Sequence, residues 1–162
     1  MKKQLFTATL LLLLSTSVFA TTAETQLPIQ LSSVTQDVDV VNNTTTLIDK
    51  VDIVQGGITI KADKAVIKLN GKTKELKTIE VYGKPAYFKR VMEDGKVITG
   101  ESGYGIYTPS DSMMVLKKNV KVIQNGNIIR ANEISYNLKA QFMKATGTKS
   151  QQVKTKLLPE TK

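Results

Sequence analysis

Apolar and polar residues alternate in short runs through most of this chain. In residues 58–69 the apolar side chains fall at every second position on either side of a polar pair. Runs with a period of two are typical of β-strands that bury one face. Turn-forming groups such as Gly56-Gly57, Asn70-Gly71 and Asn125-Gly126-Asn127 separate them, and no window of helical length has a convincing 3.6-residue period. The pattern predicts an all-β domain.

One group of strands is repeated along the chain. Residues 51–69 align without gaps to residues 120–138, at an offset of 69 residues. A weaker copy, residues 98–107, follows residues 60–69 by 38 residues, so the elementary unit is roughly half the longer offset. Repeats of this size indicate supersecondary units that stack on their neighbours. We expect such units to stack around one continuous apolar interior.

A change of phase recurs in each copy. In the first copy the apolar positions step by two as far as Ala62, by three to Ala65 and then by two again. Strict alternation in a strand cannot give a step of three without an extra residue or a bend. We predict a corner at Asp63-Lys64, repeated at Glu101-Ser102 and at Asn132-Glu133. A strand that turns a corner lets one sheet fold over onto another, as in sandwiches and jelly rolls.

The phase also predicts which side chains face the interior. In residues 85–91, Ala86 and Phe88 fall on the face opposite Lys89, and we place Phe88 inside. Other positions predicted to lie inside are Ala65, Ile67, Leu69, Tyr107, Ile134, Tyr136 and Leu138. Together they would form one apolar face that continues from copy to copy.

The two ends differ from the middle and predict edge strands. Residues 27–31 form a short apolar run that contains Pro28, and residues 153–157 alternate once more before Pro159. Proline and charge blunt an exposed edge against unwanted pairing, and Lys154 and Lys156 fit that role. The other interpretation is that each end pairs with a further copy or another protein by strand addition.

The first residues read as a secretory signal over residues 1–20. Lys2 and Lys3 precede an apolar run, and small residues allow cleavage after Ala20 or Ala23. We predict a single domain over residues 21–158 and a polar tail at 159–162. Loss of two of the 23 basic residues against 14 acidic ones lowers the net charge from +9 to +7. A basic exported protein favours phosphorylated lipids, anionic membranes or nucleic acid, unless the lysines only solvate the surface.

Catalytic and metal-binding chemistry has little support. The chain contains no histidine and no cysteine, which excludes Ser-His-Asp and Cys-His nucleophiles and imidazole or thiolate zinc sites. Asp37 with Asp39, and Glu93 with Asp94, read as solvated strand and turn residues. The tyrosines interleave with basic residues, but aromatic residues in strands usually pack against neighbours. We therefore expect a non-enzyme without a metal, a cofactor or a nucleic-acid partner.

Four stretches carry a resemblance to a known family. They are residues 26–33 (Gln-Leu-Pro-Ile-Gln-Leu-Ser-Ser), the run that ends at Asp63, residues 82–88 (Tyr-Gly-Lys-Pro-Ala-Tyr-Phe) and residues 100–107. Over residues 26–158 the chain resembles the OstA-like family of periplasmic lipopolysaccharide-transport proteins. Gly103 and Gly105 leave the weaker repeat copy, residues 98–107, less filled than its neighbours. This indicates either a wider groove or a tight bend.

The resemblance implies a slightly twisted β-jellyroll, open at both ends, that stacks head to tail into a periplasmic bridge. One end would meet the jellyroll subunit of the inner-membrane transport complex (LptC-like). The other end would meet the amino-terminal domain of the outer-membrane translocon (LptD-like). The acyl chains of lipid A would lie in the interior, and residues 153–158 would make the outgoing contact.

Two sets of candidate site residues follow from the pattern and the resemblance together. The predicted lipid-binding residues are Ile29, Ile60, Ile67, Leu69, Phe88, Tyr107, Leu116, Ile134, Tyr136 and Leu138. The predicted partner-binding edges are Pro28, Ile29, Leu31, Val153, Thr155 and Leu157.

Two other functions stay open at this point. The same fold could serve as a periplasmic assembly adaptor or chaperone that engages partner strands and carries no lipid. An open apolar channel would favour transport, whereas a channel filled by Phe88, Tyr107 and Leu138 would favour the adaptor. A glycan-processing enzyme would need an acid pair in a cleft.

Overall fold

A computed structural model describes residues 27–159 of the chain. The described residues form ten β-strands in one antiparallel sheet, together with the short 3₁₀ helix η2 at Pro109–Asp111. The strands are β1 Gln30–Ser32, β2 Thr35–Asp39, β3 Thr44–Gln55, β4 Ile58–Leu69, β5 Leu76–Val91, β6 Val97–Thr108, β7 Met113–Gln124, β8 Asn127–Asn137, β9 Phe142–Thr146 and β10 Lys154–Lys156. The all-β prediction is confirmed.

The six long strands follow one another as hairpins. The sheet order is β1-β3-β4-β5-β6-β7-β8-β10, with β2 also paired to β3 and β9 also paired to β8. At one end β2 pairs with the first part of β3 and β1 with its second part. At the other end β10 pairs with the first part of β8 and β9 with its second part. Each end of the sheet therefore consists of two separate short strands.

Every long strand is interrupted by a corner. The register shifts between Lys61 and Lys64 in the β4-β5 ladder and between Glu101 and Tyr104 in the β6-β7 ladder. In the β7-β8 ladder it shifts opposite Asn132. The three predicted corners are therefore confirmed to within one residue. The first is centred on Ala62 and Asp63, one residue earlier than predicted, and the second on Ser102 and Gly103, one residue later.

The 69-residue repeat is confirmed down to the backbone. The first and last residues of β3 lie 69 positions before those of β7. The first residue of β4 lies 69 positions before that of β8. The corner of β3 places Asp49 and Lys50 at positive φ, and the corner of β7 does the same with Lys118 and Asn119. The same bulge thus recurs at the same place in both copies.

The offset of the intermediate copy is corrected from 38 to 40 residues. The corner of β4 lies after Lys61 and that of β6 after Glu101. Tyr107 in β6 therefore occupies the inward position that Ile67 holds in β4, rather than that of Leu69. The corner fixes the register because side-chain direction is counted from the bend and not from sequence similarity.

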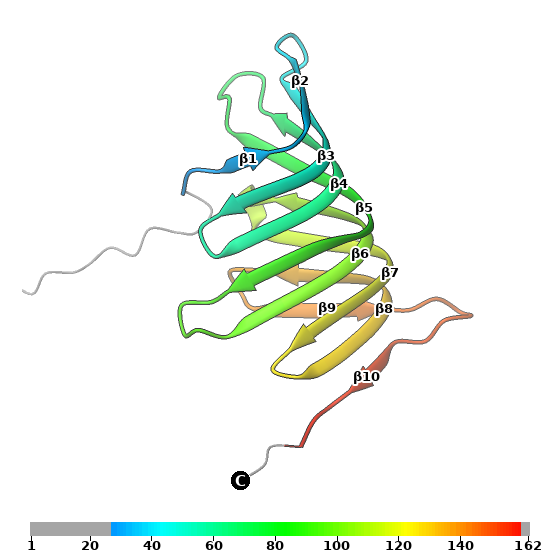
Figure 1. Ribbon diagram of the computed structural model, residues 1–162. Helices are drawn as coiled ribbons and strands as arrows, with labels where there is room; N and C mark the ends of the chain where they lie inside the picture. Colours follow the sequence, from blue (N-terminus) through cyan, green and yellow to red (C-terminus); the bar gives the residue numbers. More distant parts are fainter. Residues whose placement is uncertain (1–26, 160–162) are drawn as a thin grey trace, which may run out of the picture.

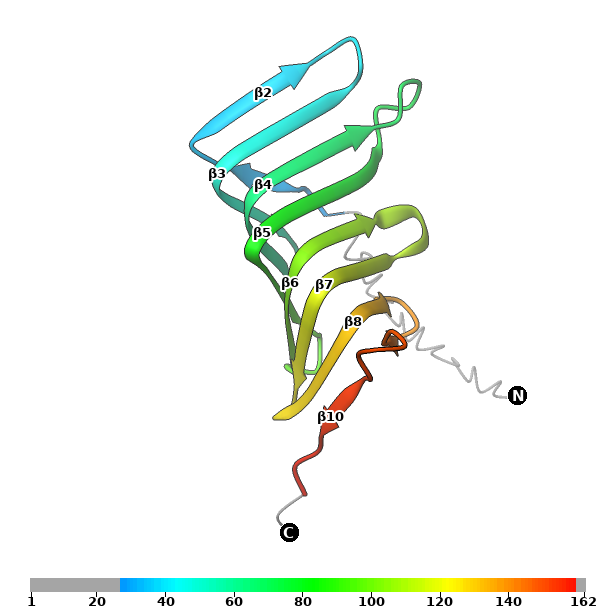
Figure 2. The ribbon, with the colours of Figure 1, turned by 90° about the vertical axis from the view of Figure 1, so that its right-hand side faces the viewer.

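The corners fold the single sheet into two facing halves, as in an open jellyroll. Figure 1 shows the bends of the long strands on one side and their hairpin turns on the other. Figure 2, which faces the bends, shows the strands stacked from β2 and β3 at one end to β8 and β10 at the other. Half-sheet A comprises residues 35–39, 44–48, 64–69, 76–82, 104–108, 113–117, 133–137 and 142–146. Half-sheet B comprises residues 30–32, 51–55, 58–61, 86–91, 97–101, 120–124, 127–131 and 154–156.

Some predictions fall outside the described residues. These are the signal at residues 1–20, its cleavage after Ala20 or Ala23, and the tail from residue 160 onward. Within residues 27–159 no helix is long and apolar enough to cross a membrane.

Candidate functional site

The inner face of half-sheet A carries two rows of apolar side chains. In each row one residue from each long strand lies beside its ladder neighbour. The row next to the corners is Leu47, Ala65, Val81, Gly105, Leu116 and Ile134, and the second row is Thr45, Ile67, Ile79, Tyr107, Met114 and Tyr136. Alternation along each strand turns the polar neighbours of these residues outward.

Half-sheet B faces them with a third row. It consists of Leu31, Ile53, Ile60, Phe88, Gly100, Val122 and Ile129. The buried members of all three rows form one core cluster. We call the space between the half-sheets, lined by these rows, the interior.

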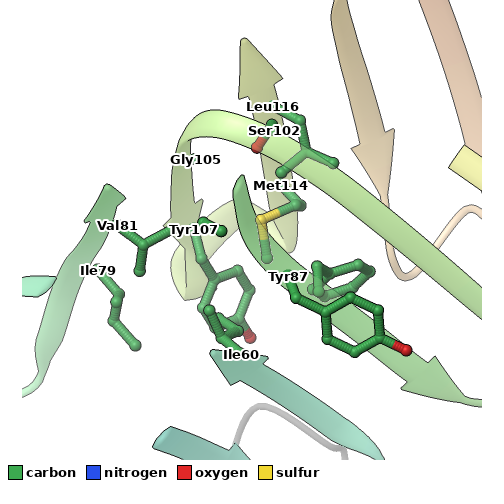
Figure 3. A pocket seen from close by; sticks show the side chains of 11 residues that line it. Ile60, Ile79, Val81, Tyr87, Ser102, Gly105, Tyr107, Met114 and Leu116 are labelled. Atoms are coloured by element: carbon green, nitrogen blue, oxygen red, sulfur yellow. The ribbon is translucent and has the colours of Figure 1, made fainter. Parts of the chain in front are cut away.

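The middle of the interior is packed. Ile60, Ala86 and Phe88 from half-sheet B and Tyr107, Met114 and Leu116 from half-sheet A surround a cavity of about 10 Å³, roughly the space that one water molecule needs. The ring of Tyr107 lies among Ile60, Ile79 and Met114 (Figure 3). Around this cavity the interior is therefore a packed apolar core.

The glycines Gly103 and Gly105 of β6 do not widen the interior. A Cβ on Gly105 would lie 3.0 Å from Val81 Cγ2 and 3.2 Å from Leu116 Cδ2, so neighbouring side chains already occupy the space. Gly103 lies at the corner of β6, where a Cβ would meet Lys118 Cβ at 3.0 Å. Of the two interpretations from sequence, the tight bend therefore applies to Gly103, and neither glycine opens a groove.

The sequence of these strands matches a known family. The family model described as "LptA/(LptD N-terminal domain) LPS transport protein" matches residues 30–142. This chain belongs to that family. The match includes β1 to β8 and ends at the start of β9, so β10 lies beyond it.

Individual LptA-family proteins are similar over nearly the whole chain. The lipopolysaccharide export system protein LptA of Escherichia coli K12 is 34% identical over 152 residues, covering 94% of this chain and 82% of that protein. LptA of Haemophilus influenzae is 34% identical over 158 residues, covering 97% and 91%. The crystal structure of LptH, described as the LptA homologous periplasmic component of the lipopolysaccharide transport device of Pseudomonas aeruginosa, superposes with a TM-score of 0.78 at 20% identity. It covers 85% of this chain and all of that one, and it confirms the jellyroll fold.

Most of the predicted lipid-binding residues line the LptA-family interior. Eight of them are buried there, namely Ile60, Ile67, Phe88, Tyr107, Leu116, Ile134, Tyr136 and Leu138. Ile29 is partly buried and packs against the edge of the core.

The prediction that Leu69 lies in the interior is wrong, because 36% of its surface is exposed. The β4-β5 ladder changes register between Lys68 and Leu69, and Leu69 pairs with Leu76 at the end of the strand. Its backbone N–H donates to Asn43 O at 2.9 Å in the neighbouring turn. Alternation counted from the corner therefore stops one residue before Leu69.

Several interior residues were missed from sequence. Ile79 and Val81 are 1% and 4% exposed and line the cavity with Met114. The alternation of residues 76–82 carries the signal for the first two, but this strand lies outside the three aligned copies. Arg90 also faces inward, at the end of β5.

The predicted partner-binding residues lie at opposite ends of the stack. Pro28 is exposed, and Ile29, just before β1, and Leu31, within β1, are partly buried. At the other end Val153 is 37% and Leu157 70% exposed, on either side of β10. Strands β2 and β9 are further edges, which the sequence analysis did not assign.

The two ends carry opposite charge. Residues 27–41, which contain β1 and β2, include Asp37 and Asp39 and no lysine or arginine. Residues 139–158, which contain β9 and β10, include no acidic residue and five lysines, namely Lys139, Lys144, Lys149, Lys154 and Lys156.

Two of the acidic residues that were set aside, Asp39 and Asp94, accept hydrogen bonds from neighbouring residues. Asp39 accepts hydrogen bonds from the backbone N–H and the side-chain amide of Asn42, at 2.9 and 2.7 Å, in the turn before β3. These hydrogen bonds lower the pKa of Asp39. Within residues 27–159 no three Asp or Glu side chains gather where they could hold a metal ion.

A polar cluster on the outer face of half-sheet A explains two of the tyrosines. Glu80 accepts from Lys68 Nζ at 3.0 Å, from Tyr82 Oη at 3.1 Å and from Tyr104 Oη at 3.3 Å. The bond from Lys68 lowers the pKa of Glu80, and burial together with the Glu80 charge raises the pKa of Tyr104 to about 12. The two rings lie 5.2 Å apart at 57°. These tyrosines therefore pack against each other and Glu80.

Proposed function

We propose that this protein is a non-catalytic periplasmic bridge that carries lipopolysaccharide between the two membranes. The observation that carries the proposal is that the apolar interior runs through all six long strands and that, within residues 27–159, no element covers its two ends. Its last members are partly buried apolar side chains: Ile29 and Leu31 at the β1 end, and Ile129, Met143 and Ala145 at the β9 and β10 end. An interior of this form continues naturally into a second jellyroll placed edge to edge.

The cargo would enter by separating the half-sheets. Each buried methylene of an acyl chain is worth about 0.8 kcal/mol, so lipid chains gain by replacing side-chain contacts across the interior. Ile60 and Phe88 from half-sheet B meet Tyr107 and Leu116 from half-sheet A around the cavity, so these side chains would contact the lipid first. The sugars would remain outside, because the hairpin side is open to solvent. Transport through such an interior needs no catalytic group, so we assign no reaction to this chain.

Association would be head to tail. The acidic end at β1 and β2 complements the basic end at β9 and β10, and the unpaired edges of these strands suit strand addition. A contact between two unlike ends is heterologous and repeats into an open filament. We assign the β1 and β2 end to the LptC-like jellyroll and the β9 and β10 end to the LptD-like domain or to the next copy.

A photo-crosslinking amino acid at Phe88 in living cells tests the cargo. We expect it to capture lipopolysaccharide, and the same amino acid at Lys89, which faces outward in β5, to capture much less. Equal capture at both positions, or none at Phe88, would overturn the lipid path.

The packed interior favours a second candidate, an assembly adaptor that uses only its edges. Such an adaptor would crosslink to partner proteins from Thr155 in β10 but would never yield a lipopolysaccharide adduct from Phe88 or Tyr107. Lipid adducts from either interior position rule it out.

A further inference from the structure

Arg90 is the only charged residue at an inward position of the long strands β3 to β8. It lies in half-sheet B between Ile58 of β4 and Ile98 of β6, both 2% exposed. A guanidinium at such a position loses hydration and depends on strong hydrogen bonds in return.

The side chain spans the interior to half-sheet A. Arg90 Nη1 donates to Tyr136 Oη and to the Leu138 carbonyl, both at 2.9 Å, and its Cζ lies 5.7 Å from the centre of the Tyr136 ring. Tyr136 and Leu138 are 5% and 3% exposed. Arg90 is the second residue before the β5-β6 turn, and Leu138 follows β8 directly. The contact therefore joins the two half-sheets on the side of the hairpin turns, where they must part to admit a large ligand.

We propose that Arg90 is the binding residue for a phosphate group of an acylated amphiphile that enters the interior. The proposal rests on the lipid-carrying function above and names the part of the ligand that Arg90 recognises. When the half-sheets part, the phosphate takes the places of the Tyr136 hydroxyl and the Leu138 carbonyl on the guanidinium.

The exchange replaces two neutral acceptors of the guanidinium with a charged one. Hydrogen bonds between a guanidinium and a phosphate are charge-assisted, often bidentate and roughly twice as strong as those to neutral oxygens. The neighbours Ile58, Ile98 and Phe88 are apolar and would hold acyl chains directly beside the charge. This combination selects a phosphate attached to hydrocarbon over a phosphate free in solution.

The test compares the affinity of purified protein for diphosphorylated and dephosphorylated lipid A in mixed micelles. We expect the wild type to prefer the phosphorylated lipid by about tenfold or more, as charged hydrogen bonds allow, and Arg90→Gln to lose that preference. The control is Lys89→Gln, which removes the same charge from the outward face of the same strand and should keep the preference.

Each other outcome is decisive. If wild type binds neither lipid, the proposed function fails, whereas equal binding of both lipids by wild type overturns only the role of Arg90. If Arg90→Gln weakens the binding of both lipids equally, the residue has a structural role and the proposal is wrong. The guanidinium NMR signal of Arg90, with outward-facing Arg130 as reference, should shift with lipid but not with inorganic phosphate. An equal shift with inorganic phosphate would make this a general anion site instead.

Discussion

At the scale of single residues, two charged side chains hold parts of the sheet together from opposite faces. Arg90 faces inward and joins the half-sheets through Tyr136 and Leu138. Glu80 faces outward and joins β4, β5 and β6 through Lys68, Tyr82 and Tyr104. The first contact crosses the interior, where the proposed lipid would enter, and the second joins neighbouring strands within one half-sheet.

The Glu80 cluster makes stability depend on pH. Its folded pKa lies below the usual 4.5 because Lys68 donates to the carboxylate. A lowered carboxyl pKa stabilises the fold above pH 4.5, and the contribution disappears as pH falls through the folded value. Glu80→Gln should therefore lower Tm at pH 7, and the difference from wild type should shrink between pH 5 and pH 3.

Thermal unfolding at pH 7, 5 and 3 checks this prediction. Lys68→Met removes the main cause of the lowered pKa and should reduce the pH dependence in the same direction. A difference between wild type and Glu80→Gln that stays constant over this range would contradict it.

The direction of a side chain could be predicted from sequence wherever its position could be counted from a corner. Phe88, Ile134 and Tyr136 follow from alternation on either side of a bend, and all are buried. Leu69 failed because the ladder shifts at its own strand end, which depends on the Leu76 partner and not on local pattern. The inward side of Arg90 follows from the outward side of Lys89. Its contact with a strand 46 residues away could not be predicted, because only folding brings the two half-sheets together.

At the scale of elements, the corner is the recurring device. Alternating apolar residues predict strands, and the step of three predicts where each strand bends. What the sequence did not reveal is that the end strands are split in two, because β2 and β9 are only five residues long and largely exposed. The offset of the intermediate copy also needed the observed bulges, since weak similarity aligns equally well two residues away.

The corner of β3 offers a test of backbone strain. Lys50 has φ of 50° and is exposed, and the left-handed conformation costs a non-glycine residue roughly 1–2 kcal/mol. Lys50→Gly should therefore stabilise the fold by up to about 1 kcal/mol after the entropy cost of glycine.

Denaturant unfolding measures the effect. Arg130→Gly, at an exposed position of β8 that pairs with Lys121 and Lys154, is the matched control and should destabilise by about 0.5–1 kcal/mol. Destabilisation of similar size by both variants would show that the corner is not strained.

At the scale of the whole molecule, charge and edges give the stack a direction. Attraction between a lysine-rich end and an aspartate-bearing end weakens in salt, because exposed charges are screened beyond about 10 Å at 0.1 M. Sedimentation velocity should show self-association that rises with protein concentration and falls between 50 and 500 mM NaCl.

Charge reversal sharpens that prediction. Asp37→Lys with Asp39→Lys should weaken self-association several-fold, and mixing this variant with Lys154→Glu/Lys156→Glu should restore a contact between the two altered ends. Lys89→Glu, in the middle of the sheet, is the control and should change little. Association that ignores both salt and charge reversal would leave the assigned ends without support.

The split end strands have a mechanical consequence. Because β1 and β2 bond to different parts of β3, and β10 and β9 to different parts of β8, each junction between subunits would consist of two independent seams. One seam could stay closed while the other yields as cargo pushes the half-sheets apart. A filament joined in this way would stay intact while its interior widens, so the passage of a lipid need not separate the subunits.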